Sequence, residues 1–147
     1  MQMFLPCFYS FLACFGFSIL YNLRGRVLWL SALGGAVCWF FYLLMGFSGN
    51  DIFQYFIASL AISVYSEVLA RVVKAPVTAF LIPGIIPMVP GGGIYYTMEY
   101  CIQGQMGRFA STGLHTLGVA GAIAIGILLV SSVFRWIHLL PVKRKKR

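Results

Sequence analysis

The stretch FLIPGIIPMVPGGGIYY, residues 80–96, decides how this chain folds, because it combines three prolines with three consecutive glycines in an apolar run. Each proline removes a backbone N–H donor and clashes with the carbonyl group four residues earlier. A continuous helix through Pro83, Pro87 and Pro90 is therefore excluded. The triple glycine at residues 91–93 favours backbone conformations that other residues avoid. The stretch predicts a break between two helical segments.

The composition around this stretch is that of an integral membrane protein. Of the 147 residues, 61% are hydrophobic and only 10% are charged, and the mean hydropathy is +0.90. About a quarter of the residues in a soluble domain are charged. This chain has eleven bases and three acids, Asp51, Glu67 and Glu99. So small a polar surface cannot cover a soluble fold, and we expect an all-α bundle of transmembrane helices in the inner (plasma) membrane.

Five apolar segments are long enough to cross a bilayer, which takes about 20 residues of helix. The predicted spans are residues 3–21, 27–47, 52–70, 77–101 and 114–137. If all five cross, ten of the eleven bases fall on one side: two follow the first span, two follow the third, and six lie at the end of the fifth. Because cytoplasmic loops carry the excess of Lys and Arg, this distribution predicts an external N-terminus and a cytoplasmic C-terminus.

We expect a single transmembrane domain over residues 1–142 and a basic cytoplasmic tail over residues 143–147. The first apolar segment precedes Arg24 and Arg26, which reverses the charge order of a secretory signal, so we interpret it as a retained span. The basic tail is more simply an anchor on anionic headgroups than a nucleic-acid site, since no basic face with interleaved aromatic residues accompanies it.

The break in the fourth span lies at membrane depth, where an unpaired backbone group facing lipid is costly. It must therefore be buried in protein or line a polar cavity. Helix can resume over residues 94–100, and its first amide groups would point back into the membrane. Such amides, at the positive end of a helix dipole, are a natural seat for a carboxylate. The alternative is a structural kink that lets helices pack closely.

Glu67 and Arg71 lie four residues apart on the third span, with the carboxylate N-terminal to the base. This order and spacing favour an ion pair on one helix face. A carboxylate in a transmembrane segment is also a candidate for proton coupling or gating. Tyr95 is a candidate to line a substrate path, whereas Tyr96 and Tyr100 are more typical of an interfacial aromatic belt.

Small residues recur on single faces of two spans, which predicts close helix packing within the chain or with a partner. They are Gly34, Gly35 and Cys38 on the second span, and Gly118, Ala122 and Gly126 on the fifth.

The sequence indicates no catalytic, metal or cofactor site. The cysteines have no CxxC spacing and are interpreted as small apolar side chains; they are Cys7, Cys14, Cys38 and Cys101. His115 and His138 lie near opposite ends of the fifth span, and neither has a predicted ligand or catalytic mate. An intramembrane enzyme would need paired acids, a Ser–His pair or a metal cluster at helical spacing, so this class is disfavoured.

Several motifs occur in a specific order along the chain. FSILYNLRGR at residues 17–26 precedes Gly34-Gly35; Glu67-x3-Arg71-x4-Pro76 follows, and then IPGIIPMVPGG at residues 82–92 with Tyr95. This pattern resembles the small, C-terminal-half-type subunit of the threonine/serine exporter family, over nearly the whole chain. The positions that match the family motifs are Asn22, Arg24, Glu67, Arg71, Pro87, Pro90, Gly91 and Tyr95.

The resemblance implies export of threonine and serine, or of a dicarboxylate such as succinate, by a complex with a larger membrane subunit. With no nucleotide-binding motif in the sequence, the proton gradient is the expected energy source. The candidate residues for substrate binding or translocation are Pro83, Pro87, Pro90, Gly91, Gly92, Gly93, Tyr95, Glu67, Arg71 and Asn22. The alternative function is a structural or assembly subunit that does not itself transport.

Overall fold

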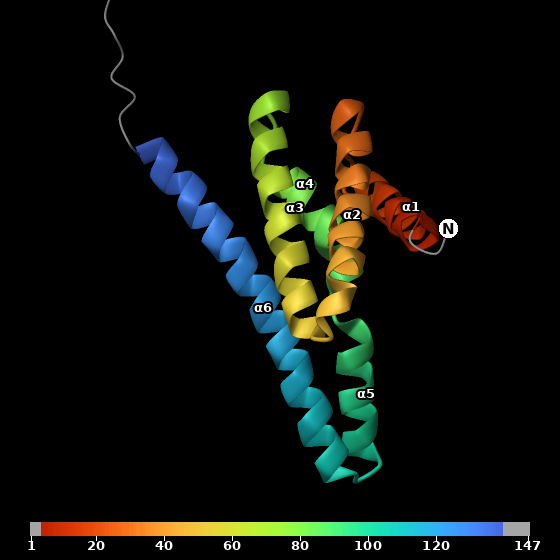
Figure 1. Cartoon of the computed structure of the whole chain (residues 1–147). Helices are drawn as coiled ribbons and strands as arrows, with labels where there is room; N and C mark the ends of the chain where they lie inside the picture. Colours follow the sequence, from red (N-terminus) through yellow and green to blue (C-terminus); the bar gives the residue numbers. More distant parts are fainter. Residues whose placement is uncertain (1–3, 140–147) are drawn as a thin grey trace, which may run out of the picture.

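The computed structural model describes residues 4–139, which form six α-helices and two short 3-10 helices. In chain order these are α1 (Phe4–Leu20), α2 (Arg26–Leu44), η1 (Met45–Ser48), α3 (Asp51–Val73), α4 (Thr78–Ile85), η2 (Ile86–Met88), α5 (Gly91–Ile102) and α6 (Met106–Leu139). No strand occurs in this part of the chain, so the prediction of an all-α bundle is confirmed (Figure 1). The expected basic tail, residues 143–147, lies outside the described residues.

Three of the helices described in residues 4–139 are long and apolar enough to cross a membrane: Arg26–Phe47, Asp51–Val73 and Met106–Ile137. A further candidate is the broken span, in which Thr78–Met88 and Gly91–Ile102 meet at a bend of 48°. α1 is apolar but has only 17 residues. The chain is therefore a multi-pass membrane protein, and a total of five crossings stays a prediction.

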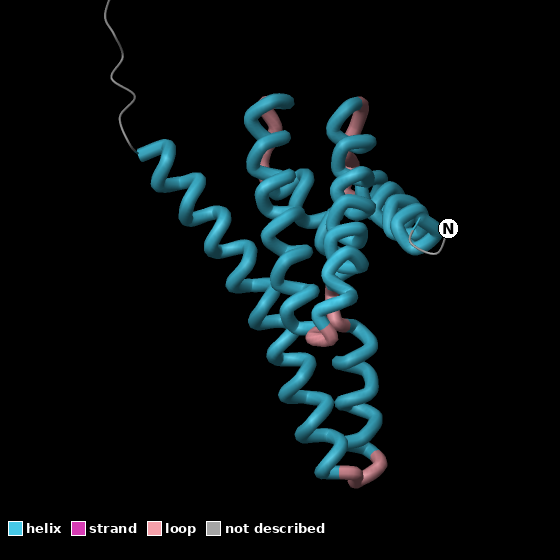
Figure 2. Tube along the Cα trace, in the orientation of Figure 1, coloured by secondary structure: helices cyan, strands magenta, loops and turns pink. Residues whose placement is uncertain are grey.

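The helices form two sections along the length of α6 (Figure 1). In the upper section of the figure α2 lies between α1 and α3, and α4 packs against α2 and α3. In the lower section α5 packs against α6, beyond the turn that joins α2 to α3. Figure 2 shows this turn partway along the molecule and the α5–α6 turn at the lower end. Because α6 packs on both α3 and α5, it joins the two sections.

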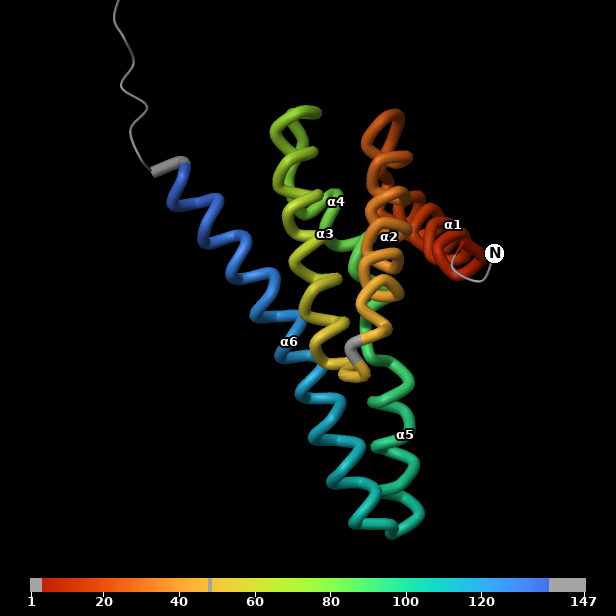
Figure 3. Tube along the Cα trace, viewed as in Figure 1, coloured from red at the N-terminus to blue at the C-terminus, as the bar shows by residue number. Residues whose placement is uncertain are grey.

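The start of α2 and the end of α3 lie at the same end of the bundle, as the colours in Figure 3 show. Arg26 begins α2, and Arg71 lies in the last turn of α3. The bases of the first and third loops therefore gather at one end, and α6 also ends on that side of the molecule. Which side of the membrane this end faces stays a prediction.

The long helix α6 begins at Met106, earlier than the expected span of residues 114–137. The hydropathy of a sequence marks the part of a helix that suits lipid, whereas the backbone hydrogen bonds of a helix do not require apolar side chains. The amide of Phe109 already donates to the carbonyl of Gln105, at 2.9 Å. The apolar pattern therefore predicted the most apolar part of α6 but missed the first turns of the helix.

Both predicted stripes of small residues pack within the chain itself. A Cβ atom on Gly126 of α6 would overlap the hydroxyl of Ser59 on α3. A Cβ atom on Gly35 of α2 would overlap the thiol of Cys14 on α1. Glycine is required at both positions because the neighbouring helix occupies the space of a side chain.

Candidate functional site

The fourth span is broken where the prolines predicted it. α4 ends at Ile85, η2 continues to Met88, and Val89 is extended with ψ 125°. Pro90 has φ −75° and ψ 54°, and α5 begins at Gly91. The bend of 48° leaves α5 continuing away from α4 toward the lower end of α6, so this segment does not turn back on itself (Figure 1).

Two carbonyl groups that lose their helical donors to prolines are bonded by side chains from other helices. Pro83 has no N–H for the carbonyl of Ala79, and the Ser31 hydroxyl on α2 donates to that oxygen at 2.9 Å. Pro87 likewise has no N–H to donate to the carbonyl of Pro83, and the Cys14 thiol on α1 donates to that oxygen at 3.0 Å. Both donors are buried, so this half of the break is sealed inside the bundle.

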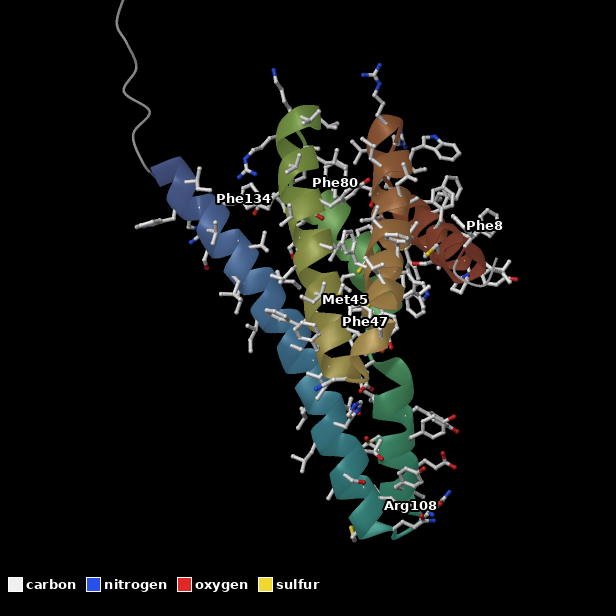
Figure 4. All side chains as sticks on the ribbon, in the orientation of Figure 1. Phe8, Met45, Phe47, Phe80, Arg108 and Phe134 are labelled. Carbon is white, nitrogen blue, oxygen red and sulfur yellow. The ribbon has the colours of Figure 1, made fainter. Side chains whose placement is uncertain are left out.

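The third proline is compensated locally. Pro90 cannot donate to the carbonyl of Ile86, and the Val89 amide donates to it instead, at 3.1 Å. The neighbouring core is formed by Phe80, Pro83 and Met88, which are fully buried; Figure 4 shows Phe80 inside the upper section. Of the two arrangements expected for a break at membrane depth, the α4 side therefore has the first, burial in protein.

The start of α5 is open. A Cβ atom on Gly91 or Gly92 would meet nothing within 4 Å, whereas one on Gly93 would overlap the Thr116 hydroxyl on α6. The Gly91 amide donates to Val89 and the Ile94 amide to Pro90. Within residues 4–139 the amides of Gly92 and Gly93 donate to no backbone oxygen. Two N–H groups are therefore unused at an exposed helix start. Free N–H groups at a helix start bind anions in many proteins.

Tyr95 lies on α5 one turn beyond this start and is 65% exposed. Its ring packs edge-on against Tyr96, with centroids 5.4 Å apart. It also borders a groove of about 230 Å³ together with Met98 and Glu99. No residue of α5 is buried, so its side chains face outward except where the helix lies on α6.

Glu67 and Arg71 form the ion pair that their spacing predicted. Arg71 Nη2 lies 3.0 Å from Glu67 Oε2, and Arg71 Nη1 donates to the Glu67 carbonyl at 2.7 Å. The guanidinium also lies over the ring of Phe134 on α6, 4.6 Å from its centroid. The side chain of Glu67 is 12% exposed and that of Arg71 36%. The pair is thus tied to two helices at the base-rich end.

The candidate residues occupy three separate places. The prolines, glycines and Tyr95 lie along the broken span, whereas Glu67 and Arg71 lie in the last two turns of α3. Asn22 lies in the turn after α1, with φ 56°, and its side-chain oxygen accepts from Arg24 at 3.2 Å. The structure brings Glu67 and Arg71 together but does not join them to the start of α5.

One contact was not expected from the sequence. His115 was predicted to have no ligand or catalytic mate, and a contact with an acid was not foreseen: its Nε2 lies 3.0 Å from Asp51 Oδ2. The pair joins α6 to the first residue of α3, and about half of each side chain is exposed. The side chain of His138 lies outside the described residues.

Comparison with known proteins identifies a family but no individual relative. No curated protein and no solved structure matches the chain significantly. Residues 6–133 match the family described as "Threonine/Serine exporter, ThrE", and this range covers most of α1, all of α2 to α5 and most of α6. The match includes the broken span, the Glu67–Arg71 pair and Asn22. The chain is therefore a multi-pass membrane protein that belongs to the threonine/serine exporter family.

Proposed function

We propose that this chain is the small subunit of a two-component exporter, which moves small carboxylate-bearing metabolites out of the cell together with a larger membrane subunit. The observation that carries the proposal is the start of α5. There the broken span leaves the amides of Gly92 and Gly93 without backbone acceptors, next to open space at Gly91 and Gly92.

A carboxylate fits this helix start for electrostatic and geometric reasons. Free N–H groups and the positive end of the α5 dipole attract an anion. The absence of Cβ atoms at Gly91 and Gly92 lets a solute approach the backbone closely. Backbone amides recognise the carboxylate that threonine, serine and succinate share, so this site alone does not choose among them.

The same feature supports a larger partner subunit. The start of α5 lies beside the turn that joins α2 to α3 (Figure 1). Unused amides there still need water, a solute or another protein surface as a partner, and lipid does not supply one. Within the described chain α5 packs against α6 and buries none of its residues. A second subunit on this open side would complete the wall of the path.

The proposed orientation places the base-rich end of the bundle in the cytoplasm of a cell with an inner (plasma) membrane, and the N-terminus outside. The supporting observation is the charge distribution, since Arg26 and Arg71 lie at one end of the bundle. We assign residues 1–142 to one transmembrane domain and residues 143–147 to a cytoplasmic tail. The proton gradient would supply the energy.

A structural or assembly subunit is the second candidate. The bonds from Cys14 and Ser31 to the α4 carbonyls favour it, because they explain the buried half of the break as helix packing alone. The exposed start of α5 is not explained in this way.

The two functions are separated by substitution at Gly92. We expect Gly92→Leu to abolish efflux of threonine, serine or succinate from cells that express both subunits, while co-purification of the subunits survives. The matched control is Gly16→Leu, because Gly16 lies within apolar α1 and a Cβ atom there also meets open space. Loss of co-purification with loss of efflux would favour the assembly function, and unchanged efflux would refute the proposed site.

A further inference from the structure

A second polar pocket lies away from the start of α5, at the base-rich end of the bundle. It has a volume of about 460 Å³ and lies between the end of α3, the start of α4 and the last turns of α6. Pockets that hold small molecules range from about 300 to 1,000 Å³. The polar or aromatic residues that line it are Glu67, Arg71, Thr78, Ser131, Phe134 and Arg135.

The charge of this pocket is positive. Its charged side chains are those of Arg71, Arg135 and Glu67, so the two guanidinium groups outnumber the one carboxylate. Val77 and Leu81 add apolar walls, and a partly apolar site strengthens the attraction between a guanidinium and an anion. The pocket therefore favours an anionic ligand.

Three contacts orient Arg71 at the wall of the pocket. It pairs with the Glu67 carboxylate, donates to the Glu67 carbonyl and stacks over Phe134. Figure 4 shows Phe134 on the upper part of α6. Because these contacts come from both α3 and α6, two helices orient the guanidinium group that a ligand near Arg71 would meet.

Arg135 follows Phe134 on α6 and borders the same pocket, and its side chain is exposed. It forms no ion pair with the acids of residues 4–139. Thr78 and Ser131, which each carry a hydroxyl group, also line the pocket. A planar guanidinium with hydroxyl donors nearby is well suited to bind a carboxylate or phosphate.

We propose that this pocket is an oxyanion-binding site, with Arg135 as its main ligand and the Arg71–Glu67 pair as its fixed wall. If the exporter function holds, the oxyanion is the carboxylate of the solute, which the site collects at the base-rich end before it reaches the start of α5. The phosphate of an anionic lipid headgroup has the same chemistry and is the other source.

The test measures ligand binding to the full-length chain, together with its larger subunit, in nanodiscs. In the first arm the lipid is phosphatidylcholine alone, and binding of radiolabelled succinate and threonine is measured. In the second arm phosphatidylglycerol is added without solute, and native mass spectrometry counts the retained lipid. The variants are Arg135→Gln and Arg135→Lys. The control is Arg108→Gln, which removes the same charge near the α5–α6 turn at the lower end (Figure 4).

We expect Arg135→Gln to weaken solute binding about tenfold, the effect of losing one charge-assisted hydrogen bond. Arg135→Lys should recover only part of this loss, because it keeps the charge but not the planar pair of donors, and Arg108→Gln should change nothing. An Arg135-dependent loss in the lipid arm alone would assign the site to headgroup phosphate. If Arg135→Gln changed binding in neither arm, the site would be refuted. This experiment measures binding and not transport. Its result is therefore independent of the efflux test: the pocket can bind an oxyanion when the wild-type complex shows no efflux, and it can fail to bind one when efflux is normal.

Discussion

The thiol of Cys14 on α1 donates a hydrogen bond to the carbonyl of Pro83 on α4, across 69 residues of sequence and a distance of 3.0 Å. That carbonyl has no helical donor because residue 87 is also a proline. We expect Cys14→Ala to lower the free energy of unfolding by about 1 kcal/mol, since it leaves a buried acceptor unpaired. Thermal unfolding in detergent would measure the change.

Two variants control this prediction. Cys14→Ser keeps a donor of similar size and should retain most of the stability. Cys101→Ala removes an exposed cysteine and should have no effect. Equal stability of Cys14→Ala and the wild-type chain would mean that the bond to Pro83 contributes nothing.

The contact between Gly126 and Ser59 predicts a strong effect of side-chain size. Gly126→Leu would place a side chain where the Ser59 hydroxyl of α3 already lies, and overpacking of this kind costs about 1 to 3 kcal/mol. We expect a lower unfolding temperature in detergent. The matched control is Gly121→Leu on the same helix, where a Cβ atom meets nothing within 4 Å; an equal loss in both variants would contradict the packing argument.

The contact between Asp51 and His115 should contribute modestly to the docking of α3 on α6. Both side chains are about half exposed, and exposed pairs of this kind are worth about 0.5 kcal/mol. A double-mutant cycle with Asp51→Asn and His115→Gln, measured by detergent unfolding, should give a coupling energy near that value. A coupling energy of zero would show that the two side chains are close without stabilising each other.

Glu67 has two interpretations, an ion pair and a proton-coupling group, and its contacts support the first. Its carboxylate lies against Arg71, which is itself held over Phe134. We expect Glu67→Gln to retain efflux that still collapses when an uncoupler dissipates the proton gradient, because the amide can still accept a hydrogen bond from Arg71. Efflux that no longer responded to the uncoupler would assign the coupling role to Glu67.

The sequence predicted those features that depend on neighbours along the chain. Prolines at positions 83, 87 and 90 break a helix whatever surrounds it, and the break was found there. The spacing of Glu67 and Arg71 fixes them on one helix face, and the ion pair was found. Long apolar runs likewise gave the approximate positions of the helices.

Contacts between distant segments could not be predicted in this way. Ser31 and Ala79 are 48 residues apart, and only the packing of α2 on α4 brings the hydroxyl to the carbonyl. The same holds for His115 and Asp51, which meet because α6 crosses the start of α3. The open space at Gly91 and Gly92, in contrast with the filled space at Gly93, also depends on where α6 lies.

The length of α6 has a mechanical consequence. This one helix carries Arg135 near one end, lies on α3 along its middle, and holds α5 near its other end. An α-helix is a stiff rod over such a length, so a change in its tilt against α3 moves the pocket at Arg135 and the glycines at the start of α5 in the same step. The two proposed anion sites, the pocket at Arg135 and the start of α5, would therefore move together because they share a single helix.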